Sequence, residues 1–295
     1  MAEFLITGAN GFLGKYIADA VSNLNFRTLG LSGCNFNVDL SAKIPDFTEN
    51  YSKIIHAAGL AHTLSSTDES ASRFFSVNAT GTANLLKGLE KPRPLPRIII
   101  FISTVAVYGL EEGENIDESA PLNGSTPYAL SKIEAENLVS KWGRENGVST
   151  LILRLPLIAG ANPPGNLGAM IKAIRNGYYF RIGDGTARRS MVLAEDVAKL
   201  VAAYTGSSGT YNLTDGYNPE VRELDKAIAS AVGRKIRVLP DSIVRTAALM
   251  GDLLPFLPIN SLKYKKLTSS LTFSDAKARR EIGWQSKSVI ENLVF

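Results

Sequence analysis

Tyr128 and Lys132 are the residues best suited to proton transfer. Thr126 is a good helix cap and Pro127 suits the first helical position, so the sequence predicts a helix that begins here and ends at Gly147. On a helix, side chains four residues apart share one face. A phenol loses its proton only near pH ~10, and an adjacent ammonium lowers that pKa by favouring the phenolate. The spacing therefore indicates a proton shuttle for the interconversion of a hydroxyl and a carbonyl. The alternative is a partly exposed tyrosine near a solvated lysine, which happen to be four residues apart.

A glycine-rich turn near the start of the sequence has the pattern of a phosphate-binding loop. A short apolar strand, residues 3–7, is followed by Gly8, Gly11 and Gly14 and then by a helical run over residues 15–24. Because a helix N-terminus after a glycine turn binds pyrophosphate, this segment predicts a dinucleotide site. The glycine spacing is G-x-x-G-x-x-G rather than the commoner G-x-G-x-x-G.

The second predicted strand, residues 27–31, leaves the choice of dinucleotide open. An acidic residue at its end would bind a ribose 2′-hydroxyl and favour NAD, whereas an arginine would accept the 2′-phosphate of NADP. The sequence offers neither, since Ser32 and Gly33 follow the strand. Asp39 comes shortly afterwards, where it could hold the adenine amino group or simply cap a loop.

Strands and helices continue to alternate along the first half of the chain. The predicted strands are residues 53–59, 97–102 and 150–155, and residues 74–89 form a predicted helix. The fully apolar run before Ser103 predicts a central parallel strand that delivers Thr104 to the carboxyl edge of the sheet, where α/β folds bind ligands. Asn78 either supports the backbone of that site or is an ordinary buried amide. The alternation predicts an α/β fold with a Rossmann-like, doubly wound parallel sheet.

The pattern changes after about residue 160. We expect a dinucleotide-binding domain over residues 1–160 and a smaller, mixed α/β substrate lobe over residues 161–295, with residues 190–215 returning to the Rossmann side. An amphipathic helix is predicted over residues 169–175. The apolar segment 243–259 is interrupted by charges and prolines, so we expect it to pack on the body of the protein, with a weak membrane-surface role as the alternative.

Composition excludes several classes of function. The net charge of +4 on 295 residues is too weak to indicate nucleic-acid binding. Cys34 is the single cysteine, which excludes an internal disulfide, and with two histidines in the chain no metal site is expected. No stretch reaches the ~20 apolar residues of a membrane span, and no basic region precedes the first apolar run. We therefore expect a cytoplasmic protein without an integral membrane segment.

Taken together, these motifs resemble the extended short-chain dehydrogenase/reductases, and within them the nucleotide-sugar epimerase/dehydratase family. The resemblance covers nearly the whole length. The matching segments are residues 7–14, 56–59, 78–82, 103–109, 128–132, 188–198, 211–214 and 273–284. Ordered motifs at compatible spacing are far more specific than any one of them.

The resemblance implies a role for individual residues. Thr104 would hydrogen-bond the reacting sugar oxygen, Tyr128 would move the proton, and Lys132 would lower the tyrosine pKa and hold the nicotinamide ribose. Asn166 and Arg189 would bind substrate, the arginine through a phosphate. The cofactor would be NAD or NADP, with NAD slightly favoured. Its predicted contacts are Gly8, Asn10, Gly11, Phe12, Leu13, Gly14, Asp39, Leu40, His56, Ala57, Ala58, Gly59, Asn78, Ser103, Tyr128, Lys132 and Pro156.

Departures from the family pattern narrow the expected activity. Val105 and Ala106 stand where the family's dehydratases carry an acid pair, which argues against a 4,6-dehydratase. Leu157 replaces an asparagine that lies near the substrate phosphates in many epimerases, and Asn166 could take over that role. The main prediction is an NAD(P)-dependent nucleotide-sugar epimerase. The alternatives are an NAD(P)H-dependent nucleotide-4-keto-sugar reductase and, from another class, a non-catalytic dinucleotide-binding regulator. A homodimer is a family expectation.

Overall fold

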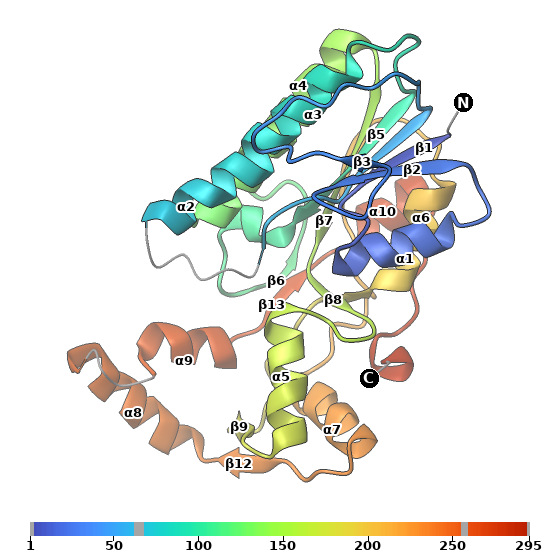
Figure 1. Ribbon diagram of the computed structural model, residues 1–295. Coiled ribbons are helices and arrows are strands. Elements are labelled where there is room, and N and C mark those ends of the chain that lie inside the picture. The colour runs from blue at the N-terminus through green and yellow to red at the C-terminus, as the bar shows by residue number, and fades with distance from the viewer. Residues whose placement is uncertain (1–2, 62–67, 255–258, 294–295) are drawn as a thin grey trace.

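The apolar runs of the first half become the strands of one sheet in the computed structural model, which describes residues 3–61, 68–254 and 259–293. Within these residues, seven parallel strands lie in the order β11-β7-β5-β4-β1-β2-β3 (Figure 1). The strands are β1 (Phe4–Thr7), β2 (Phe26–Gly30), β3 (Phe36–Asn37), β4 (Lys53–His56), β5 (Ile98–Thr104), β7 (Ser149–Leu155) and β11 (Gly209–Asn212). The predicted α/β fold with a doubly wound parallel sheet is confirmed.

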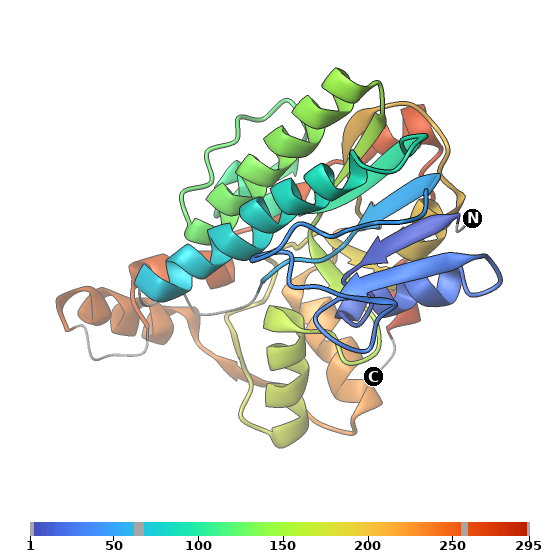
Figure 2. The same ribbon diagram turned by 45° about the horizontal axis from the view of Figure 1, so that its top comes forward.

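Helices cover both faces of this sheet because successive side chains of each buried strand point to opposite sides. Leu5 packs under α3 and α4, whereas its neighbour Ile6 belongs to the cluster under α1, α6 and α10. Figure 2 shows α3 and α4 lying side by side along one face. The helices are α1 (Phe12–Ala20), α2 (Asp68–Phe74), α3 (Gly81–Leu89), α4 (Pro127–Asn146), α6 (Ala194–Ala203) and α10 (Ala276–Ile282).

The second lobe has its own apolar core beyond the carboxyl edge of the sheet. Its helices are α5 (Gly165–Asn176), α7 (Val221–Ala231), α8 (Asp241–Leu253) and α9 (Ser261–Thr268). Short parallel pairs join β8 (Leu157–Ala159) to β10 (Met191–Leu193), β9 (Phe180–Ile182) to β12 (Arg237–Leu239), and β6 (Gly113–Ile116) to β13 (Leu271–Phe273). The described residues also contain two 3₁₀ turns, Val105–Tyr108 and Ile290–Asn292. Between β10 and β11 the chain returns to the main sheet, where α6 packs against α1.

Several predicted boundaries differ from the structure. Helix α1 begins at Phe12 rather than at residue 15, because Gly11 already serves as its cap. The predicted helix 74–89 is α2 followed by a π-helix, Phe75–Thr80, and α3. The prediction that the apolar segment 243–259 packs on the body is wrong for its described part: α8 and α9 project from the lobe as an arm in both views (Figures 1 and 2). Residues 255–258 of that segment lie outside the described residues.

Candidate active site

The carboxyl ends of the parallel strands bring most of the predicted site residues to one edge. Thr7 lies opposite His56 across β1 and β4, and Thr104 lies opposite Leu155 across β5 and β7. Pro156 follows directly at the end of β7. The glycine turn after β1 and the start of α4 adjoin the same edge, so residues far apart in the sequence line one site.

The glycine turn packs so closely on neighbouring backbone that two of its positions leave no room for a Cβ. Gly8 has φ +73°, and a Cβ there would lie 2.6 Å from the backbone nitrogen of Ala58. A Cβ on Gly14 would lie 1.9 Å from the Gly8 carbonyl oxygen, so the first turn of α1 rests directly on the loop. Phe12 and Leu13 open α1, where the backbone N–H groups have no partner within the helix. These features fit a dinucleotide, whose diphosphate would lie at the positive end of α1.

Asn10 and Asp39 have structural partners around this turn. The Asn10 amide donates to the Ser32 carbonyl oxygen at 2.8 Å and thereby ties the glycine turn to the end of β2. The Asp39 carboxylate accepts from the backbone N–H and the hydroxyl of Ser41 at 2.9 and 2.6 Å. Asp39 therefore caps its loop, the simpler of its two predicted roles. The side chain of Leu40 is buried.

The ring of His56 is buried and both of its nitrogens are hydrogen-bonded. The Thr82 hydroxyl donates to the Asn78 carbonyl oxygen at 2.6 Å, so it must accept from His56 Nε2 at 2.9 Å. Nδ1 is then the acceptor of the Thr7 hydroxyl at 2.7 Å. Burial, with a smaller effect of the Lys132 charge, lowers the pKa of His56 to about 3. The predicted cofactor contact of His56 is therefore restricted to its backbone, as for the small residues Ala57, Ala58 and Gly59 that follow it.

Asn78 holds the loop after β4 against the helix that carries Tyr128. Its side-chain oxygen accepts from the Leu60 backbone N–H at 2.7 Å, and its amide donates to the Leu60 carbonyl oxygen and to the Ser131 hydroxyl. Asn78 lies within the π-helix, a rare conformation that is frequent at functional sites. Of its two predicted readings, a polar support for the site backbone agrees with these contacts.

Thr104, Tyr128 and Lys132 meet at the end of β5. The Thr126 side chain accepts from the Ala129 N–H and caps α4, as predicted, and Gly147 ends the helix with φ +65°. The Thr104 side chain lies near enough to the Tyr128 hydroxyl to lower its pKa. Lys132 Nζ donates to the Ile102 carbonyl oxygen at 2.6 Å and lies 3.9 Å from the centre of the Phe101 ring.

The expectation that Lys132 lowers the pKa of Tyr128 is wrong in this arrangement. Burial raises the tyrosine pKa, and the Thr104 side chain is what opposes the rise. Burial lowers the pKa of Lys132 to about 7, while the Glu136 charge acts in the opposite direction. The sequence could not predict this direction, because a motif gives the spacing of two side chains but not how deeply they are buried, and burial shifts the pKa of both.

A buried polar network behind the site was missed in the sequence. The Ser103 hydroxyl donates to Glu136 at 2.5 Å, and Glu136 forms an ion pair with Arg154 at 2.7 Å. Arg154 also donates to the Tyr108 hydroxyl, which donates to the Asn212 side chain at 2.7 Å. The network joins β5, α4, β7 and β11. One signal was available, because Glu136 follows Lys132 by four residues and so lies on the same face of α4.

Asn166 and Arg189 line a cavity of about 1010 Å³ in the second lobe. Leu157 lies in the same wall, with residues of β9, α9 and the turn after β9. The Arg189 guanidinium donates to the carbonyl oxygens of Arg188, Lys266 and Ser269, and thereby fastens the end of α9. Arg189 thus spends much of its donor capacity on the backbone, which sequence reasoning did not anticipate.

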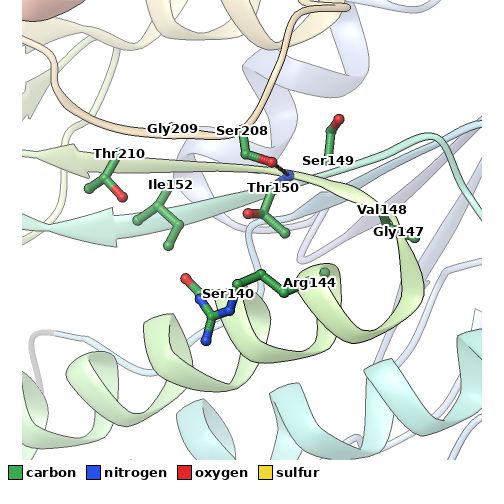
Figure 3. Close-up of a pocket in the computed structure, with 11 residues that line it drawn as sticks. Ser140, Arg144, Gly147, Val148, Ser149, Thr150, Ile152, Ser208, Gly209 and Thr210 are labelled. Atoms are coloured by element: carbon green, nitrogen blue, oxygen red, sulfur yellow. Dashed lines mark hydrogen bonds between the residues drawn. The ribbon is translucent and has the colours of Figure 1, made fainter.

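A second cavity, of about 490 Å³, lies at the opposite edge of the main sheet. It is formed by the last turns of α4 and the first residues of β7 and β11, with Arg144 and Ser140 on the helix side (Figure 3). The Ser208 hydroxyl accepts from the Thr150 N–H across its wall. None of the predicted site residues lines it, so the candidate active site is the carboxyl edge.

Comparison with known proteins agrees with the fold. The sequence matches the model of the NAD dependent epimerase/dehydratase family over residues 4–213. The chain belongs to this family. One relative, the N-acetyl-alpha-D-glucosaminyl-diphospho-ditrans,octacis-undecaprenol 4-epimerase of Escherichia coli O157:H7, is 26% identical over 92% of this chain and 87% of its own. Another, the GDP-6-deoxy-D-mannose reductase of Pseudomonas aeruginosa, is 26% identical over 81% of this chain and 83% of its own.

The same fold is found in solved structures of the family. The UDP-glucose 4-epimerase of Thermus thermophilus, solved in complex with NAD, has a TM-score of 0.71 at 24% identity and covers 97% of this chain and 94% of its own. The predicted family, the enzyme class and the use of NAD or NADP are thereby confirmed, and the choice between the two cofactors stays open. No helix among the described residues is long and apolar enough to cross a membrane.

Proposed function

We propose that this family member epimerises a sugar that is attached to a diphosphate, by transient oxidation of one sugar hydroxyl. The observation that carries the proposal is the meeting of three side chains at the carboxyl edge, where Thr104 at the end of β5 lies beside Tyr128 at the start of α4 and Lys132 follows one helical turn later. Two hydroxyls that meet at one point can both contact the oxygen of a substrate hydroxyl, one as hydrogen-bond partner and the other as proton acceptor.

Each residue has a definite task in this proposal. Thr104 orients the substrate hydroxyl. Tyr128 acts in its phenolate form, takes the proton of that hydroxyl, and returns it when the carbonyl is reduced. Lys132, with a pKa lowered to about 7, can supply or take up positive charge near neutral pH beside the reacting groups. When bound, the nicotinamide supplies a hydride acceptor that can give the same hydride back.

The cavity beside this edge supports a diphosphate-linked substrate. It is large enough for a nucleotide-sized group, and its lining includes Arg189, Lys263 and Lys266. The relatives point to the same chemistry, because the E. coli enzyme is named for an undecaprenol diphosphate sugar and the P. aeruginosa enzyme for a GDP-sugar. A glycosyl diphosphate is common to both. We propose carbon 4 as the reacting carbon, since the E. coli relative is named as a 4-epimerase.

An isotope experiment tests the proposal and separates it from its rival. The substrates are UDP-glucose, UDP-N-acetylglucosamine and undecaprenyl-diphospho-N-acetylglucosamine, each carrying deuterium at carbon 4. An epimerase gives the 4-epimer with the deuterium retained and without net consumption of NAD(P)H. Tyr128→Phe should abolish this conversion while the variant still binds the dinucleotide. Epimerisation by that variant would contradict the proposed role.

A 4-keto-sugar reductase is the second candidate. It is favoured by the reductase relative and by the lack of a carboxylate at the end of β2, where Ser32 and Gly33 stand. In that case a nucleotide-4-keto-sugar and deuterated NADPH yield a product labelled once, with one NADPH consumed for each product formed. Stoichiometric NAD released by denaturing the freshly purified protein would instead favour the epimerase, because that cofactor is regenerated in each turnover.

A further inference from the structure

The end of β2 is tied to the glycine turn and therefore adjoins the place where a dinucleotide would bind. The Asn10 amide donates to the Ser32 carbonyl oxygen at 2.8 Å and also contacts the Cys34 sulfur at 3.7 Å. Ser32 stands roughly twenty residues after the glycines, which is the interval at which dinucleotide-binding folds carry the residue that contacts the adenosine ribose. Both observations place Ser32 where the ribose 2′ group would be read.

The loop that follows β2, residues 31–35, is held in shape by two amide side chains. The Asn35 side-chain oxygen accepts from the backbone N–H and the hydroxyl of Thr28, at 2.9 and 3.1 Å. The Asn37 side-chain oxygen accepts from the Cys34 N–H at 3.1 Å. Because the asparagine of the loop is engaged in this way, the serine hydroxyl is the other side-chain oxygen that the loop can offer to a ligand.

The stretch that carries this serine is electrically neutral. Residues 31–38 contain neither an acidic nor a basic side chain. Arg27 lies near the other end of β2, where it pairs with Glu49 at 2.9 Å. Asp39 is the first charged residue after the stretch, and its carboxylate already caps its own loop. The position that carries a carboxylate in many NAD-binding folds is therefore taken by the exposed Ser32.

We propose that Ser32 sets the cofactor specificity of this chain, which accepts NAD and NADP with similar affinity. A hydroxyl both donates and accepts hydrogen bonds, so it can pair with the ribose 2′-hydroxyl of NAD or donate to the 2′-phosphate of NADP. It supplies neither the repulsion by which a carboxylate excludes that phosphate nor the ion pair by which an arginine retains it.

Fluorescence titration with NADH and with NADPH tests the inference, after any co-purified dinucleotide has been removed. We expect the two dissociation constants to differ by less than about tenfold, because no charge on the loop distinguishes the two ligands. Their ratio should not change with salt, since there is no ion pair to the 2′-phosphate for salt to screen. The inference rests on the family's use of NAD or NADP and the test measures binding alone, so its failure would leave the proposed function untouched.

Two substitutions of opposite charge make the test specific. Ser32→Asp should weaken NADPH binding relative to NADH binding by at least about tenfold, because a carboxylate would face a phosphate with about two negative charges. Ser32→Arg should shift the ratio by at least about tenfold in the opposite direction, and added salt should reduce that shift. Ser22→Asp is the matched control. Ser22 is also exposed but lies beyond the far end of α1, so its substitution should leave the ratio unchanged.

The ratio of the two constants is measured within one preparation, so a partly unfolded variant changes both constants alike and leaves the ratio meaningful. A preference of more than about tenfold for either dinucleotide in the unsubstituted protein would overturn the inference, since a charged side chain from elsewhere would then read the 2′ group. So would a ratio that neither Ser32→Asp nor Ser32→Arg alters, because Ser32 would then not contact the ribose.

Discussion

Replacing Glu136 by glutamine should destabilise the protein far more than its conservative chemistry suggests. The Glu136 and Arg154 side chains are 4% and 8% exposed and are joined by contacts of 2.7, 3.1 and 3.3 Å. Glutamine keeps the size but removes the charge, which leaves a buried guanidinium without its counter-ion. Breaking a buried pair from one side costs about 3–5 kcal/mol. The Tyr108 hydroxyl still accepts from Arg154, so we expect a value near the lower end, about 3 kcal/mol.

Equilibrium unfolding in urea gives the measurement, and two further variants give the comparison. Lys91→Met breaks an exposed pair with Asp46, whose side chains are 57% and 79% exposed, and should cost less than about 1 kcal/mol. Glu136→Gln with Arg154→Met removes both charges and should recover part of the stability that the single change loses. A single variant no less stable than Lys91→Met, or a double variant worse than the single one, would refute the reasoning.

Two other residues carry sharp predictions. The folded protein keeps His56 neutral until the pH approaches about 3, whereas an unfolded histidine takes up its proton near pH ~6.5. Between these pH values the unfolded state therefore binds more protons than the folded state. The free energy of unfolding should fall as the pH is lowered through this range. His56→Gln should remove on the order of 5 kcal/mol of that acid-dependent loss, seen as a flatter dependence of unfolding free energy on pH; an unchanged slope would contradict the assignment. Gly14→Ala should weaken NAD(P)H binding by more than about tenfold in a fluorescence titration, because its Cβ would meet the Gly8 carbonyl and distort the diphosphate loop. Gly233→Ala is the control: its φ of +66° makes an alanine strained, but a Cβ there meets nothing within 4 Å and lies outside the diphosphate loop, so it should leave binding intact.

The fold could be predicted because its signals are local and repeated. Apolar runs such as residues 97–102, the glycine turn at Gly8 and the cap at Thr126 each act within a few residues, and together they specify the parallel sheet and the helix that carries Tyr128. The strand ends then converge because parallel strands share one carboxyl edge.

What could not be predicted depends on contacts between distant segments. The donors of Arg189 are used by carbonyl groups of α9, some eighty residues later. Lys132 turns to the Ile102 carbonyl oxygen, and burial rather than a neighbouring charge governs the pKa of Tyr128. The π-helix that contains Asn78 has the composition of an ordinary helix and therefore leaves no mark in the sequence.

The position of β11 at the edge of the main sheet has a consequence for how the chain is made. β7 ends at Leu155, but its outer neighbour β11 begins only at Gly209, after the first elements of the second lobe. At ribosomal rates of roughly 5–20 residues per second, the open edge of β7 waits several seconds for its partner. During that interval an apolar strand offers unpaired backbone groups to other chains. Synthesis slowed between these two strands should therefore increase aggregation of the nascent protein, whereas a pause after residue 212 should not.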